Sequence, residues 1–205
     1  MRHYPLLCPG ACALLPPQLF GRVEYYRLMS RYESVRIDDG MRMDKRMKSV
    51  HRFDIVDAPG IQTLTVPVSK PAGPVCWRDA VVSEHGKWWA SMPNALATAY
   101  SRTPFFEFYI DRFLPLLSRD VVGMPVTELC ARADALVRDI LDISFVDAAD
   151  GAETVDYRRA DFATVLGPLP PYWQLRQAEK GFVPGLSILD LIFNKGPEAC
   201  LYLAE

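Results

Sequence analysis

Hydrophobic residues recur at helical spacing through the second half of the chain. From Thr103-Pro104 to residue 117, large apolar side chains return every three or four positions, which predicts an amphipathic helix with a wide buried face. Thr103 suits the cap of this helix, and Pro104 suits its first position, which has no intrahelical use for an N–H. The same period returns over 127–141, capped by Thr127, and a compact helix is expected over 187–193.

The first half of the chain carries strand and turn patterns instead. Residues 34–37 alternate between polar and apolar positions, as in a strand. Residues 52–56 and 62–66 flank a turn tetrapeptide over 57–60 that contains Pro and Gly, which predicts a β-hairpin. One short amphipathic helix is expected over 22–31.

These patterns together predict an α+β fold. We expect an N-terminal, mainly β region with one short helix, followed by a mainly helical C-terminal half that packs on it. A further strand is expected over 75–83, and an edge strand near 154–157 within a loop-rich stretch. The length fits a single domain over 1–205, with 1–12 as an extra N-terminal segment in an alternative division.

Composition excludes several classes of protein. Half of the 205 residues are hydrophobic and 23% are charged, which is enough apolar side chain to offset the conformational entropy lost on folding. Every apolar run is broken well before the ~20 residues of a membrane-spanning helix, so an integral membrane protein is excluded. The net charge of −2 argues against a dedicated nucleic-acid binder.

The N-terminus and the cysteines bear on the cellular compartment. The first residues are basic and partly apolar, but Pro5, Pro9 and Gly10 interrupt the apolar stretch that a secretory signal needs, so we expect a cytoplasmic protein. Five cysteines are an odd number, which favours reduced thiols over a disulfide framework. Cysteine and histidine spacing shows no metal-ligand pattern, so no metal site is predicted, and no cofactor is identified.

Several motifs resemble the WbqC-like protein family, in the same order and at similar spacing. They run from about residue 13 to the C-terminus and include Pro171-Tyr-Trp-Gln174 and the closing motif over 181–197, which ends in Asn-x-Gly-Pro. The other matching segments are 15–26, 64–68, 87–88 and 99–109. The resemblance implies a cytoplasmic bacterial protein whose relatives often sit among genes for O-antigen or other surface-polysaccharide synthesis.

The chain departs from the family pattern at three positions. Family members typically place a His four residues after the Trp matched by Trp88, where this chain has Met92. An Asn-Arg pair of the family matches His51-Arg52, and an Asn of the closing motif matches Gly185. If the family's chemistry needs that His as a general base, this chain uses a substitute, for which His51 is the first candidate, or has lost activity.

A basic cluster is the candidate phosphate site. Five of the 23 basic residues fall within 42–52, and Arg42, Lys45 and Arg46 are the predicted phosphate-binding residues. Arginine offers bidentate hydrogen bonds to phosphate and lysine a point charge, so the cluster suits a diphosphate. Arg52 is predicted to contact substrate because the family motif includes it. The alternative is a solvated loop face.

His51 and Asp190 are the candidate catalytic residues. His51 is of the residue type that most often acts as a general base, although strand alternation directs it away from Asp54. Asp190 lies three residues after Ser187, where a capping box is the structural alternative.

Four further residues are predicted to bind substrate: Trp88, Tyr100, Gln174 and Asn194. The two aromatic faces and the Gln174 amide would suit a saccharide. Packing in the core is the alternative for the aromatics, and a helix C-terminus would use Asn194 in any case.

Two functions are therefore open. The first is a role in bacterial surface-polysaccharide biosynthesis, with acyl or aminoacyl transfer to an activated amino sugar. The second is a non-catalytic binding or scaffold member of the family that has lost a site histidine. The expected partner is a small-molecule or nucleotide-linked sugar, with no nucleic acid, while the sequence leaves enzymatic activity and oligomeric state undecided.

Overall fold

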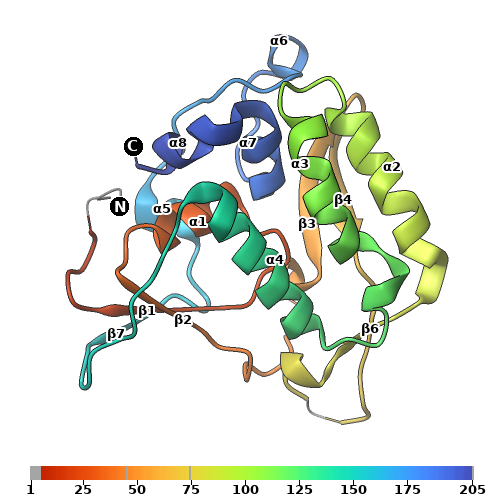
Figure 1. The fold of residues 1–205 in the computed structure, drawn as a ribbon. Helices are drawn as coiled ribbons and strands as arrows, with labels where there is room; N and C mark the ends of the chain where they lie inside the picture. The colour runs from red at the N-terminus through yellow and green to blue at the C-terminus, as the bar shows by residue number, and fades with distance from the viewer. Residues whose placement is uncertain (1–5, 45, 74, 205) are drawn as a thin grey trace.

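The protein has an α+β fold built around a small parallel sheet, a β-hairpin and a set of helices (Figure 1). The computed structural model describes residues 6–44, 46–73 and 75–204. As predicted, strands are concentrated early in the chain and helices late.

The parallel sheet joins the two halves of the chain. Its strands are β1 (Cys12–Leu15), β2 (Ser34–Ile37) and β7 (Thr154–Asp156), in the order β2-β1-β7. Helix α1 (Val23–Met29) is the crossover between β1 and β2. β2 and the β7 edge strand confirm the predictions for 34–37 and 154–157, whereas β1, which occupies the apolar N-terminal stretch, was not predicted.

The predicted hairpin is confirmed. β3 (Arg52–Asp57) pairs antiparallel with β4 (Gly60–Thr65), and the turn between them falls within the expected tetrapeptide. The strand expected over 75–83 is reduced to β6 (Val81–Val82), which pairs with β5 (Val68–Ser69).

Most helices lie beside the hairpin or above the parallel sheet in the view of Figure 1. Figure 1 shows α4 crossing the middle of the molecule, with α2 and α3 beside the hairpin and α7 and α8 together above the sheet. The helices are α2 (Trp88–Tyr100), α3 (Phe106–Phe113), α4 (Val126–Leu141), α5 (Phe162–Leu166), α6 (Gln177–Lys180), α7 (Ile188–Lys195) and α8 (Ala199–Ala204).

Two predicted helix starts are shifted by tertiary contacts. The hydroxyl of Thr103 donates to the Tyr100 carbonyl at 2.7 Å and so closes α2, which leaves α3 to begin at Phe106. Thr127 lies inside α4 rather than capping it, because Pro125 holds the cap position. The Phe105 N–H donates to the Phe193 carbonyl at 3.1 Å and the Val126 N–H to the Ala80 carbonyl at 2.9 Å, so long-range pairing at the start of each helix outweighs the local cap signal.

The start of α7 confirms one prediction and corrects another. Ser187 is the cap, and its Oγ accepts from the Leu189 N–H at 3.3 Å. The capping box with Asp190 does not form. The Ser187 N–H donates to the Asp54 carbonyl at 2.8 Å, so the Asp190 carboxylate is used elsewhere.

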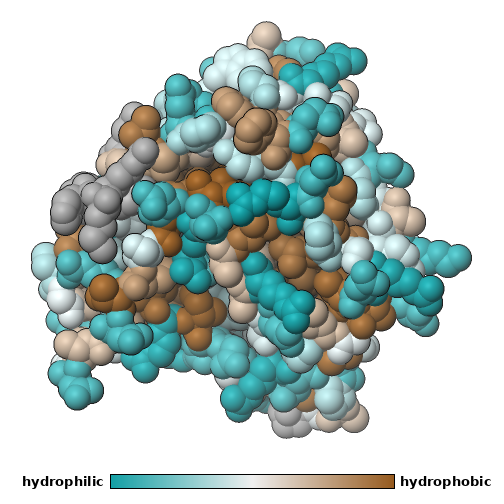
Figure 2. All heavy atoms as spheres, viewed as in Figure 1, coloured by the Kyte–Doolittle hydropathy of each residue, from teal (hydrophilic) through white to brown (hydrophobic). Residues whose placement is uncertain are grey.

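One continuous hydrophobic core connects these elements. Side chains from the sheet, the hairpin and the helices belong to a single buried cluster, in which Phe20, Phe113 and Phe193 pack edge to face. On the face drawn in Figure 2, hydrophobic residues near the centre of the molecule are bordered by hydrophilic ones. No helix in the described part of the chain is both long and apolar enough to cross a bilayer.

Candidate functional site

A polar cleft opens at the carboxyl end of the parallel sheet. Its volume is about 660 Å³. The segments that follow β1 and β7 form one side, and the β3–β4 hairpin forms another. Crevices at the carboxyl ends of parallel strands are where open α/β sheets bind ligands. We call this space the basic cleft; its lining consists of Gln18, Phe20, Gly21, Arg22, Arg46, Lys48, Ser49, Arg52, Phe53, Asp54, Thr63, Thr65, Ala160, Asp161, Phe162 and Ser187.

The hairpin contributes the polar face of its two strands to the basic cleft. Arg52 lies opposite Thr65, and Asp54 lies opposite Thr63, with the Thr63 hydroxyl donating to Asp54 Oδ1 at 2.7 Å. Because side chains alternate along a strand, these four residues share one face. Leu64 and Val66 alternate with the two threonines and are buried on the other face.

Backbone hydrogen bonds join three distant segments beneath the basic cleft. The Leu19 N–H donates to the Ser49 carbonyl at 2.9 Å, and the Ile188 N–H donates to the Gly21 carbonyl at 2.8 Å. The Ser187 hydroxyl donates to the Phe20 carbonyl at 2.8 Å. The cleft wall is therefore fixed by long-range bonds rather than by a mobile loop.

The chain is strained where it passes the basic cleft. Phe20 has a φ of +44°, in the left-handed region that a bulky residue rarely adopts. Its ring is fully buried against Phe53, with centroids 5.1 Å apart, which holds the residue in this conformation. Gly21 is needed for close approach, since a Cβ there would lie 2.8 Å from Gln18 Oε1. Strain of this kind is concentrated at functional sites.

Positive charge prevails around the basic cleft. The cations are Arg22, Arg46, Lys48 and Arg52, and the anions are Asp54 and Asp161.

Arg52 differs from the other three cations because it is half-buried, whereas Arg22, Arg46 and Lys48 are exposed. Its guanidinium makes no hydrogen bond or ion pair with any described residue, and its Nε is fully buried without a partner. Arg22, by contrast, lies 3.6 Å from Asp54 and is largely exposed. A desolvated, unpaired cation is costly, and a bound anion would remove that cost.

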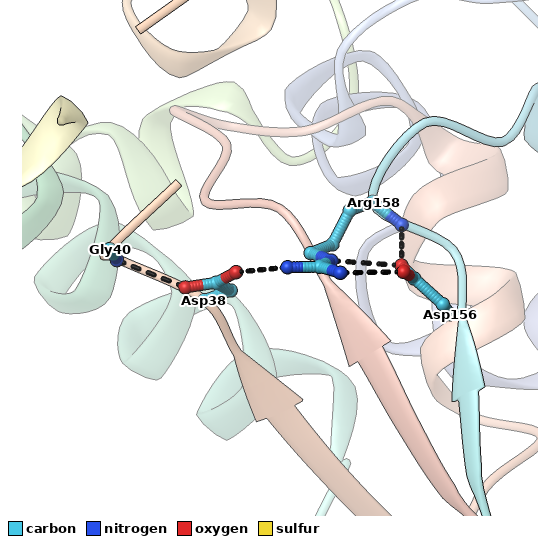
Figure 3. Close-up of polar contacts among 4 residues, drawn as sticks. All are labelled: Asp38, Gly40, Asp156 and Arg158. Atoms are coloured by element: carbon cyan, nitrogen blue, oxygen red, sulfur yellow. Dashed lines mark hydrogen bonds and ion pairs between the residues drawn. The ribbon is translucent and has the colours of Figure 1, made fainter. Parts of the chain in front are cut away.

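Arg158 links the end of β7 to the segment after β2, beside the basic cleft. Its guanidinium makes two parallel bonds to Asp156 at the end of β7, at 2.9 and 2.7 Å, and a third to Asp38 just after β2, at 2.7 Å (Figure 3). Asp38 also accepts from the Gly40 N–H at 3.0 Å. The bonds from Arg158 lower the pKa of Asp156 to about 2. This clamp orders the segment that leads to Asp161.

A second arginine connects the same segment to the opposite rim. Arg159 lies 3.2 Å from Asp44, which in turn lies 3.7 Å from the Nε of Arg46. The Arg46 backbone N–H and the Arg159 guanidinium hold the pKa of Asp44 below its usual value.

The predicted site residues divide into two groups in space. Arg46 and Arg52 line the basic cleft. Arg42 is exposed and does not line it, and the backbone of Arg42 pairs with that of Cys76 in an isolated antiparallel β-bridge. Lys45 lies outside the described residues.

His51 precedes Arg52 but does not line the basic cleft. It is half-buried, with Nδ1 3.0 Å from the Val66 carbonyl oxygen and its ring centroid 5.9 Å from that of Trp77. Burial lowers the pKa of His51, so the neutral imidazole is favoured. Strand alternation predicts that His51 and Asp54 point to different sides, and they have different partners: His51 Nδ1 bonds to the Val66 carbonyl, and Asp54 bonds to Thr63 across the hairpin.

Asp190, Tyr172, Gln174 and Asn194 meet in the interior, where they form what we call the Asp190 network. Asp190 Oδ2 accepts from the Tyr172 hydroxyl at 2.6 Å and from Gln174 Nε2 at 2.9 Å. Asn194 donates to the Asp190 carbonyl at 2.7 Å and accepts from the Leu175 N–H at 3.1 Å. Asp190 is fully buried, and burial raises its pKa. The network cross-links α7 to the preceding loop.

The two predicted aromatic contacts are also buried. Tyr100 packs its ring on Phe193, with centroids 5.3 Å apart, and Trp88 donates from Nε1 to the Ser83 carbonyl at 2.9 Å. Both side chains are at most 4% exposed, so neither ring presents an open face to a sugar.

The sequence interpretation missed most of the basic cleft. Gln18, Arg22, Ser49 and Asp161 come from segments that only the folded chain brings together. The available signal was the N-terminal family motif over 15–26, which contains two of them. Among the described residues, no group of three His, Cys, Asp or Glu side chains is placed to hold a metal ion.

A comparison with protein-family models agrees with the sequence motifs. The model of the WbqC-like protein family matches residues 17–156 and 143–202, which together cover most of the chain. The chain belongs to the WbqC-like protein family. No curated protein and no solved structure matches it. Membership confirms the resemblance drawn from the motifs and is compatible with a role associated with polysaccharide biosynthesis.

Two departures from the WbqC-like pattern have structural explanations. Gly185 has a φ of +75°, a conformation that Gly and Asn tolerate better than other residues, so an Asn at this position serves the same backbone. Met92 is 3% exposed and lies on the buried stripe of α2 with Trp88 and Leu96. In this chain, position 92 packs in the core.

Proposed function

We propose that this WbqC-like protein acts in the biosynthesis of a bacterial surface polysaccharide, of the O-antigen type, and binds a phosphate-bearing activated sugar in the basic cleft. Family membership supports the pathway, and the chemistry of the cleft supports the ligand. Four cations against two anions favour an anionic ligand, and the threonine and serine hydroxyls around them suit sugar or phosphate oxygens.

The observation that carries the proposal is Arg52. Its half-buried guanidinium has no counter-ion among residues 6–44, 46–73 and 75–204, and it presents donors in a planar fork, the geometry that binds phosphate in bidentate fashion. Arg46, Lys48 and Arg22 would then hold the rest of a diphosphate from the rim. Of the predicted phosphate-binding residues that the structure describes, Arg46 lines the basic cleft and Arg42 does not.

Acyl or aminoacyl transfer to an amino sugar is the finer form of this proposal. Such a reaction needs a base near the acceptor amine. His51 and Asp190 are the proposed catalytic residues from the sequence, and both lie behind the cleft wall. Asp54 is the carboxylate in the cleft that Thr63 and Arg22 orient, so we add it as a candidate base.

The proposal can be tested with ligands that differ only in phosphate number. Isothermal titration calorimetry with UDP, UMP and uridine is expected to give affinities that fall in that order. Arg52→Gln is expected to weaken UDP binding by about tenfold or more, because it removes a charge-assisted hydrogen bond. Arg42→Gln is the matched control, an exposed arginine of the same basic cluster outside the cleft. Equal binding of UDP and uridine, or an unchanged affinity in Arg52→Gln, would contradict the proposal.

The burial of Met92 favours a second candidate, a non-catalytic binding member of the family. If the family's His is a general base, a methionine packed in the core cannot replace it. This candidate predicts that the protein binds UDP but gives no transfer product with any amino-sugar acceptor and acyl donor. A product formed by the wild type and lost in Asp54→Asn would instead support catalysis.

A further inference from the structure

A second pocket lies across Gln18 from the basic cleft. It has a volume of about 550 Å³ and opens between the carboxyl ends of β1 and β2 and the face of α4 that carries Thr127, Ala131, Asp134 and Arg138. Gln18 lines both spaces and is 6% exposed, so it forms a shared wall. Nothing in the proposed function uses this pocket.

The inner surface of the second pocket is largely apolar. Pro17, Tyr25, Ile37 and Cys130 line it, and both Tyr25 and Cys130 are buried. The Tyr25 hydroxyl is already bonded to the Pro16 carbonyl at 3.1 Å, so the ring presents an apolar surface to the pocket. An aliphatic group fits such a wall.

The charges around the second pocket are paired except for two. Asp134 is bonded to Arg138 at 2.7 Å, and Glu128 is bonded to Arg132 at 2.6 Å.

The two others are Asp39 and Arg78, exposed residues of the pocket lining whose backbones are hydrogen-bonded to each other. The Arg78 N–H donates to the Asp39 carbonyl at 3.3 Å, while neither charged side chain has an ion pair or hydrogen bond among the described residues. The mouth thus offers one carboxylate and one guanidinium.

Two buried polar atoms of the pocket residues also have no hydrogen bond. Gln18 Oε1 and Asp134 Oδ1 are both acceptors without a partner in the part of the chain that the structure describes. Gln18 and Asp134 are each more than nine-tenths buried. Because Gln18 and Asp134 are buried while Asp39 and Arg78 are exposed, the charged groups of a ligand would meet Asp39 and Arg78 at the mouth.

We infer that the second pocket binds a small zwitterion with an aliphatic body, an α-amino acid of the leucine type. Its ammonium group pairs with Asp39, its carboxylate with Arg78, and its side chain packs on Pro17, Ile37 and Cys130. The inference concerns a different space from the basic cleft and does not depend on the ligand of that cleft. If both proposals are correct, the two ligands bind on opposite sides of Gln18.

The test uses L-leucine and three analogues that each lack one feature. Calorimetry on the full chain compares leucine with 4-methylpentanoate, 3-methylbutylamine and glycine, which lack the ammonium, the carboxylate and the aliphatic body. Leucine is expected to bind about tenfold more tightly than each analogue, since each loses one paired charge or the apolar contact. No binding of leucine at millimolar concentration, or equal affinity for all four, would overturn the inference.

Variants locate the binding in the pocket. Ala131 and Ala135 are exposed alanines of α4, one turn apart, and of the two only Ala131 lines the pocket. Ala131→Trp is expected to weaken leucine binding at least tenfold, with Ala135→Trp unchanged. Should Ala131→Trp fail to fold, Asp39→Asn provides the same test at the surface. Wild-type affinity for leucine in the folded variant would overturn the assignment. UDP affinity measured on the same samples separates failure of this site from failure of the basic cleft.

Discussion

The basic cleft and the Asp190 network are both polar, but they differ in how far their groups are satisfied by the protein itself. In the Asp190 network, one carboxylate oxygen accepts from both Tyr172 and Gln174, and Asn194 bonds to backbone on both sides. In the basic cleft, Arg52 has no hydrogen-bond or ion-pair partner in the described part of the chain, and the cations outnumber the anions. A network whose groups bond mostly to one another holds the fold together, even though Asp190 Oδ1 has no hydrogen-bond partner among the described residues. An unsatisfied cation next to solvent is instead available to a ligand.

The largest effect on stability is expected from the Asp190 network. Asp190→Ala removes the acceptor of the Tyr172 hydroxyl and one acceptor of Gln174, which keeps its bond to the Val183 carbonyl. The buried Tyr172 donor is left unpaired, at a cost of about 3 kcal/mol in the free energy of unfolding. Urea denaturation of the variant and the wild type measures this loss in the free energy of unfolding. Asp139→Ala, which removes an exposed carboxylate paired with Arg112, is the control and should change stability by less than about 1 kcal/mol. Equal losses of stability in Asp190→Ala and Asp139→Ala would contradict the structural role of the Asp190 network.

The pH dependence of stability tests whether the Asp190 carboxyl is perturbed by burial in the network. Burial raises the pKa of Asp190 above its ordinary value of 3.8, so the folded state keeps a proton that the unfolded state has released. As the pH rises from 3.8, the wild type should therefore lose stability relative to Asp190→Asn, until the folded carboxyl has also ionised. The urea midpoints of the two proteins, measured across this pH range, give their difference in stability. The other carboxylates affect both proteins equally, so their contributions cancel in this difference. A constant difference would show that Asp190 is not perturbed.

Variants at Gly185 test whether this position requires a backbone conformation or the chemistry of a particular side chain. Because its φ is +75°, Gly185→Ala should destabilise the protein by about 1 kcal/mol, whereas Gly185→Asn should cost less. Thermal unfolding of the two variants side by side measures this. Equal costs for Ala and Asn would remove the conformational explanation of the family's Asn.

The smallest effect on stability is expected at the Arg158 clamp. Its ion pairs are partly exposed, so Arg158→Gln should change the free energy of unfolding by less than about 1 kcal/mol. UDP affinity should nevertheless fall, by less than tenfold, because the segment leading to Asp161 loses its anchor. Arg36→Gln, on the same sheet but outside the cleft, is the control. An affinity equal to that of the control would remove Arg158 from the site.

Local patterns in the sequence predicted most of the fold. The turn tetrapeptide predicted the hairpin, and strand alternation placed Arg52 and Asp54 on the face away from His51 and Phe53. The cap signals at Thr103 and Thr127 gave the right helices with shifted starts, since Pro125 and the Tyr100 carbonyl compete for those positions. The parallel pairing of β1 with β7 could not be predicted, because it joins segments from opposite ends of the chain.

The site was harder to predict for the same reason. Polar residues of the family motifs are candidates for binding and for buried networks alike, and the sequence does not distinguish the two. Tyr172 and Gln174 surround Asp190 only after the loop folds over α7, and Arg52 becomes a cleft residue only when Gln18 and Asp161 approach it. The separation between binding and structural residues is thus a property of long-range packing.

The most direct test of this separation measures UDP affinity and the free energy of unfolding in both Arg52→Gln and Asp190→Asn. We predict that Arg52→Gln loses affinity while keeping wild-type stability, and that folded Asp190→Asn changes stability while keeping wild-type affinity. Loss of UDP affinity in folded Asp190→Asn, with wild-type affinity in Arg52→Gln, would contradict the account.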